Sequence, residues 1–133
     1  TRLFGFVPYR ASEGRQLFVS TGCQACHQIG YTTATGLAVN PYSDFLLHDM
    51  GSALAEGTGS DQNIITEWRT SPLWGLGLAK TLNPKAGYLH DGRALTIEQA
   101  ILWHGGEAQL AKDHFIHLNK NQRDVLLSFL ETL

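Results

Sequence analysis

The chain has 133 residues, of which 43% are hydrophobic and 17% are charged, a length that corresponds to one domain. This composition excludes an intrinsically disordered chain, and the net charge of -2 provides no general basic field for binding nucleic acid. The sequence contains no apolar run of about 18 residues, so we predict no membrane span. We therefore expect one globular domain with a hydrophobic core of its own.

The first ten residues precede the predicted domain, and we interpret residues 1–10 as an N-terminal arm and residues 11–133 as the domain. The arm contains the apolar stretch 3–9, which either docks on a partner or covers the core. The chain starts at Thr1, and no charged segment with an apolar stretch comes before it. We interpret it as an exported chain whose signal peptide has been removed, although a truncated sequence would begin in the same way.

A short predicted helix with Ser12 as its N-cap leads to residues 23–27, which read Cys-Gln-Ala-Cys-His. This order is the attachment signature of a c-type haem: two thiols reach the two vinyl groups, and the following imidazole reaches the iron. A thioredoxin-like redox pair would need a βαβ pattern, and a zinc site would need a second Cys/His pair at matching spacing. We therefore predict one covalent haem c, held by Cys23, Cys26 and the iron ligand His27.

Residues 28–95 are rich in Gly and Pro and show no convincing strand alternation. A connection of this length in a compact domain usually carries function or wraps a ligand, and here we expect it to wrap the haem. Residues 44–48 are predicted to form a short helical or extended turn. His48 and His90 are each followed by Asp, and we expect both to lie in turns and to hydrogen-bond the backbone.

The C-terminal third carries the clearest helical pattern. Thr96 and Gln99 have the spacing of a capping box, and residues 97, 100, 101 and 104 share one helical face that ends at Gly105. Residues 107–117 are predicted to form a short helix or turn. The last helix is predicted to start near Asn119, with a buried stripe formed by Leu126, Phe129, Leu130 and Leu133. The predicted fold class is therefore mostly α, a single domain with long loops around one haem.

Four segments together carry a family resemblance: residues 23–27, 42–51, 68–77 and 88–108. In this order they resemble the C-terminal haem domain of the di-haem oxidoreductases, relatives of the bacterial di-haem cytochrome c peroxidases. The resemblance implies a c-type cytochrome fold and a periplasmic or extracellular location. Family enzymes carry two haems in two domains, and this domain corresponds to the electron-transfer haem rather than the peroxidatic one.

The second axial ligand of the iron has several candidates: the single methionine, Met50, and the histidines at positions 48, 90, 104, 114 and 117. Residue 104 lies before the final helix, on the apolar face of its own helix. In the resembling peroxidases, the residue at this position is the Met that ligates the electron-transfer haem, and His stands in its place here. We therefore predict ligation by His27 and His104, with Met50 as the alternative and another His or an open position remaining.

Two arginines in the matched segments, Arg69 and Arg93, are candidate partners of the haem propionates, because guanidinium binds carboxylate bidentately. The function we expect is that of a monohaem c-type cytochrome, an electron carrier or relay subunit. The alternatives are a peroxidase- or oxidase-type enzyme, or the haem subunit of one whose second domain is on another chain, and a building block of a haem-bearing assembly. The expected partners are redox proteins and other haem chains, and homo-oligomerisation is left open.

Overall fold

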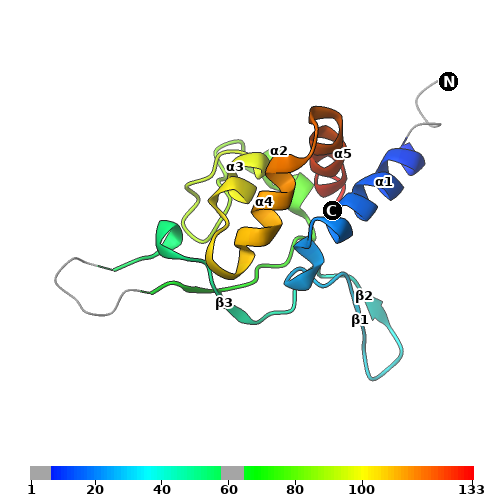
Figure 1. The fold of residues 1–133 in the computed structure, drawn as a ribbon. Helices are drawn as coiled ribbons and strands as arrows, with labels where there is room; N and C mark the ends of the chain where they lie inside the picture. The colour runs from blue at the N-terminus through cyan, green and yellow to red at the C-terminus, as the bar shows by residue number, and fades with distance from the viewer. Residues whose placement is uncertain (1–6, 58–64) are drawn as a thin grey trace.

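The computed structural model describes residues 7–57 and 65–133 (Figure 1). Across these two ranges the chain forms five α-helices and two small antiparallel sheets. The helices are α1 (Val7–Ser20), α2 (Ala79–Leu82), α3 (Ile97–Trp103), α4 (Gln109–His117) and α5 (Lys120–Leu130), and the strands are β1 (Tyr31–Thr32), β2 (Ala38–Val39), β3 (Leu47–Asp49) and β4 (Glu67–Arg69). The architecture is therefore mixed, and the prediction of a mostly α fold is confirmed only in part.

The first helix begins earlier than predicted. α1 spans Val7–Ser20, so Ser12 lies inside the helix and the prediction that it is the N-cap is wrong. Pro8 in the first turn explains the early start, because its fixed φ suits a helix and its missing N–H would have no partner there. Residues 7–10 of the predicted N-terminal arm therefore belong to α1, and residues 1–6 lie outside the described residues.

The core lies where α1 and α5 pack against each other, with α4 beside them (Figure 1). Gly14 permits the close approach, because a Cβ at this position would collide with the Cβ of Phe129. The buried side chains come from all three helices: Phe18, Phe115, Leu126, Phe129 and Leu130. The ring of Phe18 contacts the ring of Phe129 edge-on at 5.8 Å between centroids, a geometry that aromatic pairs prefer.

The C-terminal helices follow the sequence pattern closely. Thr96 caps α3 by accepting the N–H of Gln99, and α5 begins with a complete capping box formed by Asn119 and Gln122. Of the predicted stripe, Leu126, Phe129 and Leu130 are buried on α5, whereas Leu133 lies beyond the helix and is half-buried. The caps are confirmed because they depend on contacts within one helix, and the helical spacing of the three buried residues places them on the face that packs against α1.

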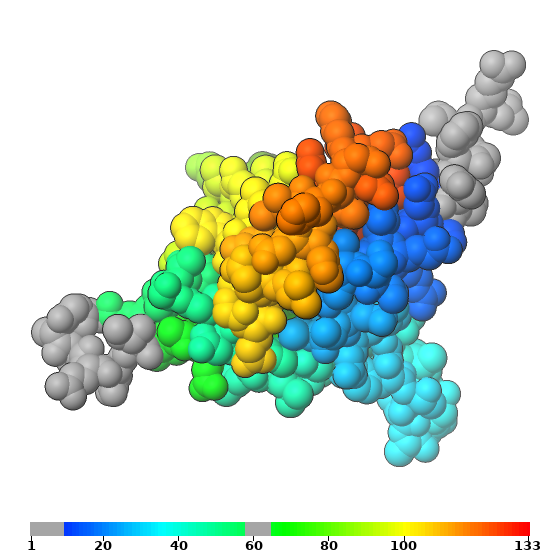
Figure 2. All heavy atoms as spheres, in the orientation of Figure 1, coloured from blue at the N-terminus to red at the C-terminus, as the bar shows by residue number. Residues whose placement is uncertain are grey.

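The two sheets occur where no strand was expected, and that prediction is wrong. β1 and β2 form a hairpin that projects from the body of the molecule (Figures 1 and 2). β3 pairs with β4 in the register His48 to Trp68, which joins two of the segments that carry the family resemblance. Strands of two or three residues are too short for alternation to be visible in the sequence. Among the described residues, no helix is long and apolar enough to cross a membrane.

Candidate haem site

The attachment segment follows directly after α1. Gly22 adopts φ 94°, a left-handed conformation that Gly accepts without strain, and it turns the chain into the short 3-10 helix Cys23–Ala25. The hydroxyl of Thr21 lies 3.3 Å from the Sγ of Cys23. Both cysteines are free thiols, and burial raises the pKa of each. Both side chains are therefore neutral thiols at neutral pH.

His27 is held in place by residues 42–44, which hydrogen-bond to the attachment segment. The N–H of Asp44 donates to the carbonyl of Cys26 at 2.8 Å, and the Nδ1 of His27 lies 2.9 Å from the carbonyl oxygen of Tyr42. A carbonyl only accepts, so Nδ1 carries the proton and Nε2 keeps its lone pair. Tyr42 adopts φ 54°, an uncommon conformation for a residue other than Gly. Burial lowers the pKa of His27 to about 4, which keeps the imidazole neutral and able to bind a metal.

His104, at the end of α3, has the same kind of hydrogen bond as His27. Its Nδ1 lies 2.7 Å from the carbonyl oxygen of Ala100, one turn earlier in the same helix, so Nδ1 donates and Nε2 is again the free nitrogen. Burial lowers the pKa of His104 as well. A ligand histidine in metalloproteins commonly donates its other N–H to a carbonyl or carboxylate, which fixes the tautomer and the ring.

The rings of His27 and His104 lie with their centroids 6.5 Å apart and their planes at 47°. Metal–imidazole bonds are about 2 Å long, so two rings that ligate one ion from opposite sides have centroids about 6 Å apart. The observed spacing fits one ion between two neutral imidazoles. Cys23 and Cys26 lie on the same short segment as His27, and the donor set therefore fits a covalently attached haem.

The roles of the other predicted site residues, Met50, Arg69 and Arg93, stay predictions. Half-buried Met50 follows β3, and its carbonyl oxygen would lie 3.0 Å from a Cβ at Gly105. Exposed Arg69 ends β4 opposite Leu47. The partners of Arg93 are local: its Nε donates to Asp91 at 2.6 Å, Nη1 donates to the carbonyl of Ala53 at 2.9 Å, and the guanidinium lies 5.0 Å from the ring centroid of Trp103.

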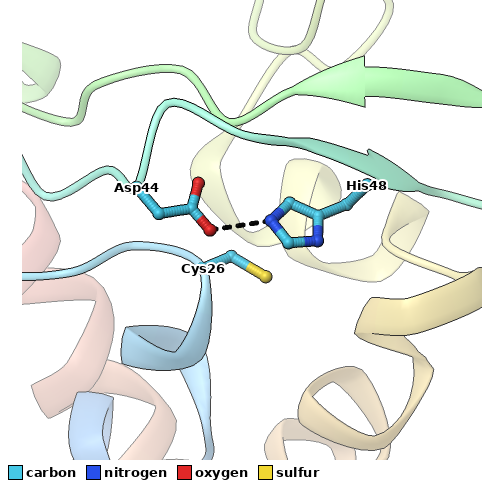
Figure 3. A group of neighbouring side chains, drawn as sticks. All are labelled: Cys26, Asp44 and His48. Atoms are coloured by element: carbon cyan, nitrogen blue, oxygen red, sulfur yellow. Dashed lines mark hydrogen bonds and ion pairs between the residues drawn. The ribbon is translucent and has the colours of Figure 1, made fainter.

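Sequence reasoning missed a polar cluster beside the histidine pair. His48 lies in β3, not in a turn, and it contacts two carboxylates rather than the backbone. Its Nε2 lies 2.7 Å from Asp44 Oδ2, and its Nδ1 lies 2.8 Å from Glu107 Oε2. The Sγ of Cys26 lies within 4.8 Å of the ligating atoms of Asp44 and His48 (Figure 3). The spacing of Asp44 and His48 was the only signal in the sequence, since Glu107 is 59 residues away from His48.

The charges in this cluster are fixed by the hydrogen bonds. Carboxylates accept at both ring nitrogens, so His48 carries both protons and a positive charge. Glu107 and then Asp44 raise the pKa of His48, and His48 in turn lowers the pKa of Glu107. Burial alone would raise the pKa of Asp44, but hydrogen bonds from the Leu46 N–H, His48 and Thr70 outweigh burial and lower it.

A second His–carboxylate pair lies near the turn that precedes α3. The Nε2 of His90 lies 2.7 Å from Glu56 Oε1, so the expected backbone hydrogen bond of His90 is replaced here by a carboxylate. The ring of His90 stacks on the indole of Trp68, with centroids 3.6 Å apart and planes at 8°. The indole N–H of Trp68 donates to the carbonyl of Leu54 at 3.0 Å. These contacts connect residues 52–56 to β4. Within the part of the chain that the structure describes, neither His90 nor Glu56 forms a hydrogen bond with His104.

Comparison with known proteins identifies the family. The family described as "Di-haem oxidoreductase, putative peroxidase" matches residues 8–133. No curated protein and no solved structure matches the chain significantly. The match covers nearly the whole chain, including the attachment signature, His104 and the β3–β4 pairing between them. The chain therefore belongs to the di-haem oxidoreductase family.

Proposed function

We propose that this domain is a monohaem c-type cytochrome that relays electrons through an iron ligated by His27 and His104. The observation that carries the proposal is the 6.5 Å separation of the two ring centroids. Each ring uses Nδ1 for a carbonyl, at 2.9 Å for His27 and 2.7 Å for His104. Nε2 is therefore the nitrogen that each ring offers to a metal, and together His27 and His104 would leave the iron without an open position, which suits an electron-transfer haem.

Covalent attachment through Cys23 and Cys26 is the second part of the proposal. Both are free, half-buried thiols in the short turn that leads into His27. The haem supplies one-electron redox chemistry when bound, and the protein supplies its orientation and surroundings. In this chain, the 42–44 segment holds His27, α3 holds His104, and burial keeps both imidazoles neutral. These features support a c-type cytochrome fold with closed coordination.

A peroxidase needs an open iron position and an acid–base group within reach of the bound peroxide. The candidate acid–base group that follows His27 most closely in the sequence is His48, but Asp44 and Glu107 occupy both of its ring nitrogens. The arrangement of the ligands thus favours electron relay over peroxide chemistry in this domain. By its resemblance to the family's electron-transfer domain, we further propose an exported location and redox proteins, including other haem domains, as partners.

The test combines extraction and spectroscopy of the haem-loaded protein. Acid–acetone should leave the haem on the chain, and the oxidised protein should be low-spin and bind cyanide only slowly. His104→Ala should convert the iron to high spin and let cyanide bind, whereas Met50→Leu should leave the spectrum unchanged, because it swaps similar volumes. Loss of colour into the solvent would contradict covalent attachment. A near-infrared thioether-to-iron band that disappears in Met50→Leu would assign the site to Met50.

A further inference from the structure

We propose that Asp44, His48 and Glu107 form a bridge that positions His104 opposite His27. The inference rests on the proposed function, because it concerns the second ligand of the same iron. His48 is the centre of this bridge. Its imidazolium contacts Asp44 beside the attachment segment (Figure 3), and it also contacts Glu107, which follows the distal ligand. The polar atoms of the three side chains bind one another or backbone N–H groups, so we assign them as positioning residues rather than ligands.

The proximal end of the bridge begins at the attachment segment. The N–H of Asp44 donates to the carbonyl of Cys26 at 2.8 Å, next to His27 in the chain. The side chain of Asp44 is only 5% exposed, and its Oδ1 accepts the N–H of Leu46 at 2.9 Å. Its Oδ2 accepts from His48 at 2.7 Å. The hydrogen bond to Leu46 therefore fixes the orientation in which the Asp44 carboxylate contacts the imidazolium of His48.

The distal end is anchored to the segment that follows His104. Glu107 lies three residues after His104 and uses both carboxylate oxygens: Oε2 accepts from His48 at 2.8 Å, and Oε1 accepts the N–H of Asp49 at 3.1 Å. The two backbones also touch directly. A Cβ at Gly106 would collide with the carbonyl oxygen of Asp49, and a Cβ at Gly51 would lie 2.9 Å from the nitrogen of Gly106.

His104 needs this external support because its own hydrogen bond is local. Its Nδ1 donates to Ala100 in α3, which fixes the ring relative to its helix but not relative to His27. The contacts from Cys26 through Asp44 and His48 to Glu107 connect the segment of His27 to the segment of His104. They therefore fix the position of His104 relative to His27. Partners that orient metal ligands from outside are worth about 10–100-fold in metal affinity or activity when they are removed.

The experiment uses the haem-loaded protein and two matched pairs of variants. His48→Phe keeps an aromatic ring but removes both hydrogen bonds, and His90→Phe removes the one hydrogen bond of the other His–carboxylate pair. Glu107→Gln and Glu56→Gln form the second pair and change one carboxylate partner each. The measurements are the rate of cyanide binding, the midpoint potential, and hydrogen exchange in residues 104–108.

In His48→Phe we expect cyanide to bind about 10-fold faster or more, with a shifted potential and faster exchange in residues 104–108. Glu107→Gln should change the same three measurements in the same direction by less, and it keeps the test decisive should His48→Phe not fold. His90→Phe and Glu56→Gln should resemble the unmodified protein. The bridge would be overturned if His48→Phe matched His90→Phe, and Glu107→Gln matched Glu56→Gln, in all three measurements.

This outcome is distinguishable from failure of the proposed function. If the unmodified protein is high-spin, or if His104→Ala leaves its coordination unchanged, then His104 is not the ligand and the proposed function fails together with the bridge. If His104→Ala opens the iron while His48→Phe and Glu107→Gln match their controls, only the bridge is wrong.

Discussion

The side of the molecule where α1, α4 and α5 meet and the side formed by β3, β4 and the segment after α3 are held by different forces. The helical side buries Phe18, Phe115 and Leu126, each no more than 1% exposed. The β3 side relies on close backbone contacts and on His48 between two carboxylates. Apolar burial tolerates small shifts, whereas a hydrogen-bonded bridge fixes direction. We therefore expect the first side to set stability and the second to set ligand placement.

The largest effect should come from the helical side. Leu126 is fully buried between α1, α4 and α5, so Leu126→Ala should lower the free energy of unfolding by about 2–5 kcal/mol. The low-spin spectrum should persist in the folded fraction, because Leu126 lies outside the ligand segments. Guanidinium unfolding followed by circular dichroism measures the first effect, and the visible spectrum measures the second. A high-spin spectrum in the folded protein would break the proposed division between the two sides.

On the β3 side, the backbone contact at Gly106 offers a sharper test. Gly106 has φ 52° and no space for a Cβ, whereas Gly36 has φ 82° with nothing within 4 Å of an added Cβ. Both Ala variants carry the left-handed strain, so their difference reports the contacts with the backbone of Asp49 and Gly51. Gly106→Ala should therefore cost about 1–3 kcal/mol more than Gly36→Ala, measured by guanidinium unfolding.

The spectra of the same two variants complete this prediction. Gly106→Ala must displace the segment that follows His104, so it should add a high-spin fraction and allow cyanide to bind. Gly36→Ala, located in the projecting hairpin between β1 and β2, should keep the low-spin spectrum. Equal stability losses with two unchanged spectra would show that the close contact does not place the distal segment.

The two sides also differ in how far the sequence predicts them. The caps of α3 and α5 and the buried stripe of α5 follow from spacings of three or four residues, and these local patterns were sufficient. The start of α1 was missed because Ser12 offered a cap signal inside a longer helix. The strands were missed because β3 and β4 are three residues long and pair across a loop, which leaves no periodicity to detect.

The candidate site divides along the same line. Cys23, Cys26 and His27 are adjacent and form a known signature, and the position of His104 came from the family resemblance. The structure places the rings of His27 and His104 together. Glu107 could not be connected with His48 from the sequence, because their contact spans 59 residues and depends on how β3 packs against the segment after α3.

The smallest expected effect is a pH dependence that only the β3 side should show. The pKa of His48 is raised by Glu107 and Asp44, so its stabilising contribution is complete below about pH 6.5, the value of an unfolded His. It is lost as the pH rises through the raised folded pKa. The pKa values of Asp44 and Glu107 are lowered, so their contributions are present above about pH 4 and are lost on further acidification. The bridge is therefore strongest between these two limits.

His48→Phe should accordingly lower the melting temperature more at about pH 5.5, inside this window, than at a pH above the raised pKa of His48, where the unmodified protein has lost the second proton of this side chain. The change in stabilisation should stay below about 1 kcal/mol, as for ion pairs near the surface. Leu126→Ala is the matched control, because apolar burial has no proton to lose and its effect should be the same at both pH values. A pH-independent effect of His48→Phe would mean that His48 stabilises β3 by packing alone, and the contrast between the two sides would then lose its electrostatic part.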